Sequence, residues 1–309
     1  MNRLRISVSP HIHSGQSTQS IMRDVLIALS PAAIAGVIIF GWRALFVMLV
    51  SVATSMGFEA LYNLIVKKDQ TVSDLSAAVT GLLLGMNLPA TIPYWQVIIG
   101  SLFAIVVVKC LFGGLGCNLV NPAIAARVLM LVSFSGTMAQ NAFPRGVDAT
   151  SSATPLAVLQ EGGAPSLSDL FLGNVGGAIG ETCKLALLIG FVYLLVRRVI
   201  TWHIPVTFIG SVFVLSFLFN GFDAYTALLM TLSGGLFLGA IFMATDYVTS
   251  PYTAWGRVIF GFGAALITVM IRFWGTYPEG VSYGILFMNI LHPYINVWTK
   301  HRRFGEVKA

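Results

Sequence analysis

Charge is what this sequence of 309 residues has least of. Asp, Glu, Lys and Arg together make up 10% of the chain, whereas 56% of the residues are hydrophobic. So few charges cannot cover a water-soluble globule of this size, because soluble monomers rarely expose large apolar surfaces. The composition therefore excludes a soluble protein and predicts an integral membrane protein.

Cysteine is also scarce. Cys110, Cys117 and Cys183 lie in or beside apolar segments, without C-x-x-C spacing or a neighbouring His. This pattern argues against disulfides and against a metal site, so we expect buried, inert thiols and no bound metal. The first residues, "MNRLRISVSPHIHSG", lack the apolar core of a signal peptide and are expected to stay in the cytoplasm.

Apolar runs of about twenty residues, the length that a bilayer core requires, recur along the chain. We therefore predict an all-α polytopic fold with about ten transmembrane helices. The predicted spans lie near residues 21–41, 43–66, 72–88, 93–112, 119–134, 176–196, 202–220, 223–243, 255–274 and 281–299.

Basic residues indicate the orientation of these spans. Most of the short basic clusters fall on one side, which the positive-inside rule assigns to the cytoplasm. The net charge of +6 therefore reflects topology and gives no reason to expect a nucleic-acid partner. The cytoplasmic group comprises Arg3, Arg5, Lys67, Lys68, Arg197, Arg198, Arg257 and the tail "KHRR" at 300–303, and the other side carries Arg43, Arg145 and Arg272.

The two halves of the chain share a pattern. "TGLLLGMNLPATIPYWQVIIG" (80–100) resembles "GGLFLGAIFMATDYVTSPYTAWGRVIFG" (234–261), and each is followed by a basic residue (Lys109, Arg272) and an element with Asn and Pro ("NLVNPA", "MNILHP"). Five spans per half is an odd number, so the second half must run inverted, with broken or re-entrant segments near the middle of the membrane. We expect a cytoplasmic leader (1–20), a first repeat (21–134), an extracytoplasmic loop (135–175), a second repeat (176–299) and a cytoplasmic tail (300–309).

Two segments that interrupt the spans carry candidate binding residues. "FGGLGCNLVNPA" (112–123) cannot be a plain helix, and its Asn121 either lines a cofactor or ion path or caps the next helix. "FMATDYVTSPYTAWG" (242–256) places Asp246 and Thr249 at the cytoplasmic end of a span. The Asp246 carboxylate either binds a ligand or closes a turn.

Ionisable residues within or near the spans are candidates for ion movement. These are Glu59, Asp74, Glu181 and Lys184. Glu181 and Lys184 are three residues apart, so the alternative is that they neutralise each other on one helix face.

The longest hydrophilic passage contains "DATSSATPL" (148–156), which by itself is a turn-forming Ser/Thr loop. Pro155 should keep Thr154 out of a helix. No His or Lys lies nearby to activate the hydroxyl of Thr154, so any reaction there needs a second enzyme.

Four motifs in order, "RISVSPHIHSG", "FGGLGCNLVNPA", "DATSSATPL" and "FMATDYVTSP", carry a family resemblance over essentially the whole chain. The sequence resembles the D subunit of the Rnf ion-translocating electron-transport complex and its relative, the B subunit of the sodium-pumping NADH:quinone reductase. The resemblance implies a fold like that of urea and ammonium transporters. It also implies an FMN joined through its phosphate to Thr154 by a separate flavin transferase, which uses FAD and a divalent metal on the outer face. Ser152 stands where the family motif has Gly.

The resemblance further implies a function. It is that of a subunit, not catalytic alone, of a ferredoxin:NAD oxidoreductase complex in the bacterial cytoplasmic membrane, where flavins carry electrons and Na⁺ or H⁺ is moved outward. Its partners would be the iron-sulfur and flavin subunits of that complex. A second, non-covalent flavin (riboflavin or FMN) is implied, and Asn121, Asp246 and Thr249 are the expected flavin or ion contacts. The alternatives are a passive channel or transporter on the same fold, and a structural anchor for redox partners.

Overall fold

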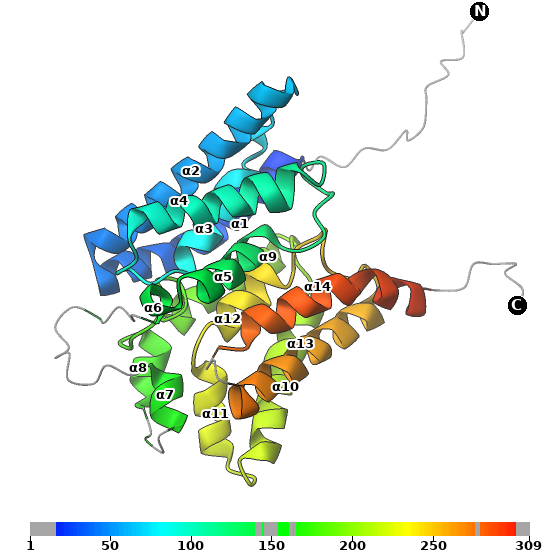
Figure 1. Cartoon of the computed structure of the whole chain (residues 1–309). Coiled ribbons are helices and arrows are strands. Elements are labelled where there is room, and N and C mark those ends of the chain that lie inside the picture. Colours follow the sequence, from blue (N-terminus) through cyan, green and yellow to red (C-terminus); the bar gives the residue numbers. More distant parts are fainter. Residues whose placement is uncertain are drawn as a thin grey trace, which may run out of the picture.

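The computed structural model describes residues 17–139, 144, 154–160, 163, 165–275 and 279–300. Every regular element in these ranges is a helix, which confirms the all-helical fold class for this part of the chain (Figure 1). Three helices are long and apolar enough to cross a membrane, or four if one bent pair of helices is counted as a single span. Shorter apolar helices pack between them. This architecture is that of a polytopic membrane protein.

The first half of the chain consists of two long helices followed by short ones. Its elements are α1 (Thr18–Phe40), α2 (Trp42–Val66), η1 (Val72–Asp74), α3 (Ser76–Met86), α4 (Tyr94–Leu102), the π-helix η2 (Phe103–Cys110) and α5 (Pro122–Ser133). Helix α2 packs along α3 and α4. A Cβ atom on Gly81 of α3 would lie 2.7 Å from the carbonyl oxygen of Ser51 in α2, so this glycine permits the close approach.

The second half contains a break in the middle of a predicted span. Its elements are α9 (Lys184–Val196), α10 (His203–Phe219), α11 (Ala224–Leu232), α12 (Leu236–Leu238), the π-helix η3 (Gly239–Met243), α13 (Ala254–Trp274) and α14 (Val281–Trp298). Helix α11 and the segment 236–243 are bent by 66° relative to each other. Gly234 makes this break possible, because its φ of +68° lies in the left-handed region that favours glycine. The sequence predicts 223–243 as one span with the break in the Pro-bearing stretch that follows, whereas the structure places a break inside this span, at Gly234.

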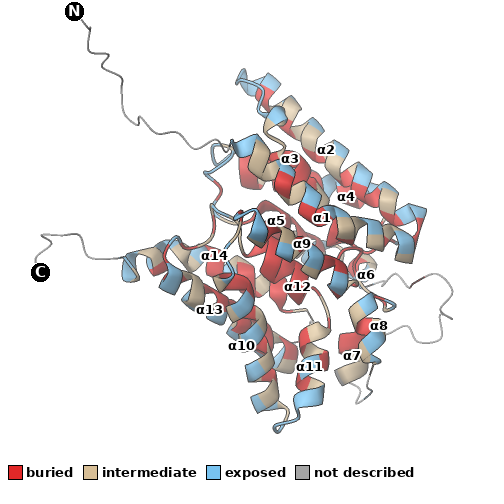
Figure 2. Ribbon diagram, turned by 180° about the vertical axis from the view of Figure 1, so that it is seen from behind, coloured by how far each residue is buried: buried red, intermediate tan, exposed pale blue. Residues whose placement is uncertain are grey.

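Helices from the two halves also pack against each other. Helix α1 lies along α9, and α5 contacts α14 near the centre of the molecule (Figure 1). Figure 2 shows buried residues gathered on the inner helices, with exposed ones on the outward faces of the long helices. Many of those exposed side chains are large and apolar, as a lipid-facing surface requires.

Two sequence predictions need correction here. The stretch predicted as a loop (135–175) contains short helices, namely α6 (Ser135–Met138), α7 (Pro155–Gln160) and α8 (Leu167–Leu172). The buried side chains Leu156 and Leu170 hold α7 and α8 against the bundle. The span expected from residue 176 begins as a helix only at Lys184, because the glycine-rich residues before it bond to the end of α3 (Gly180 N–H to Met86 O, 2.7 Å).

The cysteines differ from one another. Cys110 is buried and Cys183 partly buried, but Cys117 is exposed in the glycine-rich segment before α5. The expectation of three buried thiols is therefore wrong for Cys117. Residues 1–16 of the predicted leader, residues 148–153 of the motif "DATSSATPL" and residues 301–309 of the tail lie outside the described residues.

Candidate functional site

Thr154 lies on the wall of a cavity of about 450 Å³. It directly precedes α7, outside the helix, as the Pro155 argument predicted. Its Oγ1 atom accepts a hydrogen bond from the N–H of Ala157 (3.3 Å). The rest of the wall comes from the segment after α3, from α5 to α9 with the residues between them, from the α11–α12 break and from the segment before α14. The volume lies in the range of cavities that hold cofactor-sized ligands.

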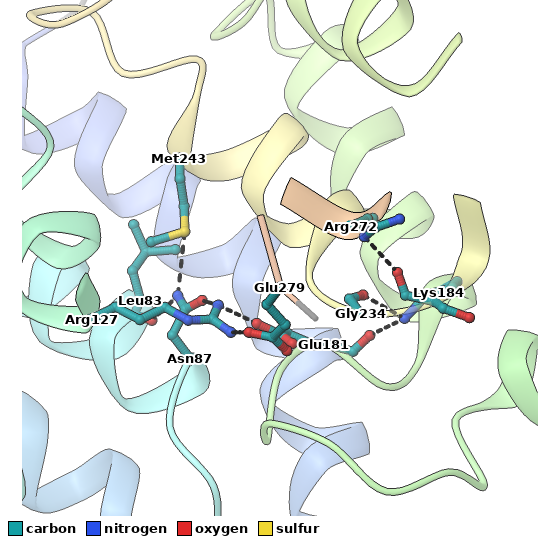
Figure 3. Close-up of polar contacts among 10 residues, drawn as sticks. Leu83, Asn87, Arg127, Glu181, Lys184, Gly234, Met243, Arg272 and Glu279 are labelled. Carbon is teal, nitrogen blue, oxygen red and sulfur yellow. Dashed lines mark hydrogen bonds and ion pairs between the residues drawn. The ribbon is translucent and has the colours of Figure 1, made fainter. Parts of the chain in front are cut away.

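A cluster of charged side chains forms the inner wall of this cavity (Figure 3). Arg127 of α5 is 4% exposed and forms ion pairs with Glu181 and Glu279. It also donates a hydrogen bond to the side-chain oxygen of Asn87. The Nε atom of Arg127 has no hydrogen-bond partner among the described residues. Arg127 therefore connects α5, the end of α3 and the segments that precede α9 and α14.

Lys184, the first residue of α9, is the second cation on this wall. It is 1% exposed, and its ammonium donates to the backbone carbonyls of Glu181 and Gly234, the latter at 3.1 Å. Its partners are carbonyl oxygens and not the carboxylate of Glu181, which pairs with Arg127. The interpretation that Glu181 and Lys184 neutralise each other on one helix face is therefore wrong, because Glu181 precedes the helix.

The glycine pair at the α11–α12 break makes room for this cluster. A Cβ atom on Gly235 would overlap with Oε1 of Glu181. Only glycine allows the backbone to approach the carboxylate so closely. The glycines that break the span therefore also allow Glu181 to take its place on the charged cavity wall.

Three residues on the wall have hydrogen-bond donors that no other described residue accepts. Arg127 Nε and Thr182 Oγ1 are buried without a partner in the described part of the chain. Lys184 makes two hydrogen bonds with an ammonium group that has three hydrogens. Unsatisfied buried donors are costly, so this wall suits a ligand that presents several hydrogen-bond acceptors.

The other predicted site residues, Asn121, Asp246 and Thr249, come together in a second cluster and do not line the cavity. Asn121 caps α5 by accepting from the N–H of Ala123 (3.0 Å), and donates to the carbonyl of Met243 (3.2 Å). The Thr249 hydroxyl donates to Asp246 (3.2 Å). Burial raises the pKa of the Asp246 carboxyl, although bonds from the Val248 N–H and the Thr249 hydroxyl oppose this.

Asn289 of α14 completes the second cluster. With its amide oriented to satisfy both neighbours, it donates to the carbonyl of Thr249 (3.2 Å) and accepts from the N–H of Asn121 (3.1 Å). Met243 joins this cluster to the cavity wall, because its sulfur accepts a hydrogen bond from Asn87 (3.3 Å) (Figure 3). A continuous set of buried contacts therefore runs from the cavity to Asp246.

A third polar cluster lies between α2, α3 and η2. Lys109 donates to Glu59 (2.7 Å) and to the hydroxyl of Ser76 (2.6 Å), which donates to Asp74 (2.5 Å). None of these four residues lines the cavity beside Thr154. Two of the charged residues singled out for ion movement, Glu59 and Asp74, are thus engaged in one network with Lys109.

Sequence reasoning missed Arg127, Glu279, Asn87 and Asn289. Arg127 gave the clearest signal, since it is the sole charge in the predicted span 119–134. A charge inside a membrane span is by default a functional candidate. Glu279, Asn87 and Asn289 carried no such signal, because their roles depend on segments distant in sequence.

Together, the apolar helices define a multi-pass membrane protein, and the part that the structure describes contains a cavity lined by hydrogen-bond donors. The model of the NQR2, RnfD, RnfE family matches residues 5–305, and the chain belongs to this family. The resemblance seen in its motifs is thereby confirmed.

Individual relatives agree along their full length. The D subunit of the Na⁺-translocating ferredoxin:NAD⁺ oxidoreductase complex of Acetobacterium woodii is 46% identical, over 100% of this chain and 98% of the relative. The D subunit of the proton-translocating complex of Clostridium ljungdahlii is 41% identical, over 98% of this chain and 97% of the relative. The D subunit of the ion-translocating oxidoreductase complex of Aliivibrio salmonicida is 36% identical, over 98% of this chain and 99% of the relative.

Proposed function

We propose that this chain is a membrane flavoprotein subunit of a ferredoxin:NAD oxidoreductase complex and carries electrons through an FMN attached to Thr154. The chain is not catalytic alone, and its partners are the other subunits of the complex. The flavin would supply the electron-carrying chemistry. The observation that carries this proposal is the position of Thr154 on a cavity whose wall offers unused hydrogen-bond donors.

The residues of the cavity fit a flavin. The ring system presents carbonyl oxygens and ring nitrogens as acceptors, which match the free donors of Arg127, Thr182 and Lys184. Leu156, Leu170 and Met138 provide apolar surface in the same cavity. Attachment would form a bond between Thr154 Oγ1 and the FMN phosphorus of FAD, break the pyrophosphate, release AMP and pass the hydroxyl proton to a base of a flavin transferase.

The predicted topology is part of the proposal, with both termini in the cytoplasm and Thr154 outside. Several contacts support it by joining residues that the charge pattern puts on the same side. Thr154 and Glu279, both assigned outside, share the cavity, and Arg43 donates to the carbonyl of Thr91 (2.7 Å). On the cytoplasmic side Arg197 bonds to Asp24 (3.1 Å).

We also propose that the helices form two inverted five-helix repeats, on a fold like that of urea and ammonium transporters. Helices α1 and α9 would be equivalent, as would α5 and α14, and each pair packs across the junction of the halves. Asn121 and Asn289, from the two matched Asn-Pro elements, are hydrogen-bonded there. In this scheme 21–134 and 176–299 are the repeats, separated by the outer segment 135–175.

The second cluster is our proposed location for contacts to the second, non-covalent flavin or to the translocated ion. Asn121, Asp246 and Thr249 lie on the side assigned to the cytoplasm and connect through Met243 to the cavity. The complex would move Na⁺ or H⁺. The names of the relatives include both ions, so pumping by the assembled complex with and without Na⁺ distinguishes the two.

Attachment can be tested on a denaturing gel viewed under ultraviolet light. The chain is co-expressed with the flavin transferase. A fluorescent band is expected for the wild-type sequence but not for Thr154→Val. Thr182→Val is the matched control. It removes a threonine hydroxyl from the wall of the same cavity but leaves the attachment residue in place, so the band should remain. A chain without fluorescence under these conditions would support the passive channel. Intact ferredoxin-dependent NAD reduction in an assembled Thr154→Val complex would support the structural anchor.

A further inference from the structure

The cavity beside Thr154 is lined by two cations and two carboxylates, and a third cation lies behind its wall. The cations are Arg127, Lys184 and, behind Gly234, Arg272, whereas the carboxylates are Glu181 and Glu279. Both carboxylates are bound by Arg127. Arg272 donates to the carbonyl of Met230 (2.6 Å) and that of Ser233 (3.1 Å). With all five groups ionised, the cluster has one positive charge in excess.

Within the described ranges, Lys184 is the cation on the cavity wall that has no ion pair with a carboxylate. Its two hydrogen bonds go to backbone carbonyls, and the side chain is 1% exposed. It is also the first residue of α9, where the helix dipole adds positive potential. Holding an ammonium in such a place is costly, and ionisable groups inside a membrane are generally kept for function.

We propose that Lys184 sets the reduction potential of the flavin attached at Thr154 by stabilising the negative charge that the flavin gains on reduction. The inference rests on the flavin attachment proposed above. Uptake of two electrons, supplied by partner subunits, and one proton converts the neutral ring into an anion. A positive charge nearby favours that anion over the oxidised ring, and more strongly where water is excluded.

Arg127 does not fill this role, although it lines the same cavity. Its charge is already opposed by two carboxylates, and its contacts join several segments of the fold. Thr182 donates without a charge. Lys184 therefore contributes electrostatically, Thr182 by hydrogen bonding alone, and Arg127 mainly to structure.

The test is a redox titration of the purified full complex. The contribution of the flavin on Thr154 is identified as the part of the total titration signal that disappears in Thr154→Val. Relative to the wild-type sequence, Lys184→Met should shift the equilibrium between reduced and oxidised flavin about tenfold toward the oxidised form. This shift lowers the midpoint potential by about 30 mV for a two-electron couple. Lys184→Arg keeps the charge and should restore most of the potential. Thr182→Val should change it less than Lys184→Met.

The gel separates failure of this inference from failure of the proposed function. A fluorescent band in Lys184→Met together with an unchanged or raised potential overturns the role of Lys184 and leaves flavin attachment intact. Absence of the band from the wild-type chain overturns both the role of Lys184 and the attachment of flavin to Thr154. If Lys184→Met does not assemble, Lys184→Gln, which keeps a polar side chain without the charge, is judged by the same lowering of the potential.

Discussion

At the scale of single residues, the environment of an ion pair decides what its loss costs. Arg127 is buried with both of its carboxylate partners in contact, whereas the side chain of Arg197 is 51% exposed where it meets Asp24. Breaking a buried pair leaves an uncompensated charge in a medium that solvates it poorly. In the second pair the guanidinium of Arg197 is half exposed to water, but the carboxylate of Asp24 is only 8% exposed, so water can replace only part of this interaction.

Arg127→Met should therefore destabilise the protein by about 3–5 kcal/mol. Arg197→Met should cost less, because only one buried carboxylate loses its cation and Tyr193 still donates to it (3.2 Å). Thermal unfolding in detergent, followed by size-exclusion chromatography with fluorescence detection, measures the difference. Equal losses in the two variants would show that Arg127 is not held in a buried ion network.

The Glu59 and Lys109 pair offers a second test at this scale, because both side chains are 3% exposed. Glu59→Leu alone leaves a buried ammonium and should cost about 3–5 kcal/mol. Adding Lys109→Met removes the stranded charge and should recover much of that loss. Thermal unfolding of the single and double variants tests this recovery. Additive losses of stability would contradict the buried ion pair.

At the scale of secondary-structure elements, close helix packing depends on particular glycines. A Cβ atom on Gly190 of α9 would overlap with the carbonyl oxygen of Ala28 in α1, whereas one on Gly210 of α10 would meet nothing within 4 Å. Both glycines lie inside helices. They therefore separate the effect of helix packing from the general preference of helices for alanine.

We expect Gly190→Ala to push α1 and α9 apart and to lower the unfolding temperature. Gly210→Ala should leave that temperature unchanged or raise it slightly, because alanine is the better helix former by about 1 kcal/mol. A thermal unfolding comparison of the two variants checks this. Equal effects would mean that α1 and α9 are not in close contact.

The N-cap of α5 is a further element-scale feature. Asn121→Ala removes the cap, worth about 1 kcal/mol, and the hydrogen bond to the carbonyl of Met243, also worth about 1 kcal/mol. Asn121→Ser keeps a capping oxygen without adding a buried charge and loses the donor to Met243, so its destabilisation should be the smaller of the two. Denaturation midpoints of both variants test this, and the reverse order would refute the capping role.

At the scale of the whole molecule, the arrangement of helices in the membrane makes a prediction about sidedness. Lys68, after α2, should face the cytoplasm, and Asp223, before α11, should face outward; both lie just outside helices. In a chain whose three native cysteines are replaced by alanine, Lys68→Cys should react with a membrane-impermeant maleimide only after the cells are permeabilised. Asp223→Cys should react in intact cells. The opposite pattern would invert the proposed topology.

The sequence by itself determined the class of protein and the family. Twenty-residue apolar runs and scarce charge are properties of composition, and four ordered motifs identify the family without any coordinates. The position of Thr154 outside α7 was also predicted, since proline acts through local backbone geometry, whereas the helix break at Gly234 was not.

Only the tertiary structure decided what surrounds Thr154. Arg127, the pair Glu181 and Lys184, and Glu279 come from three separate parts of the chain. Their contacts differ from the pairing that the spacing of Glu181 and Lys184 suggests. Local spacing predicts contacts only within one continuous helix, and Glu181 precedes α9. Long-range packing chooses the partner of a buried charge, because each cation and carboxylate must be satisfied by whatever the fold brings near it.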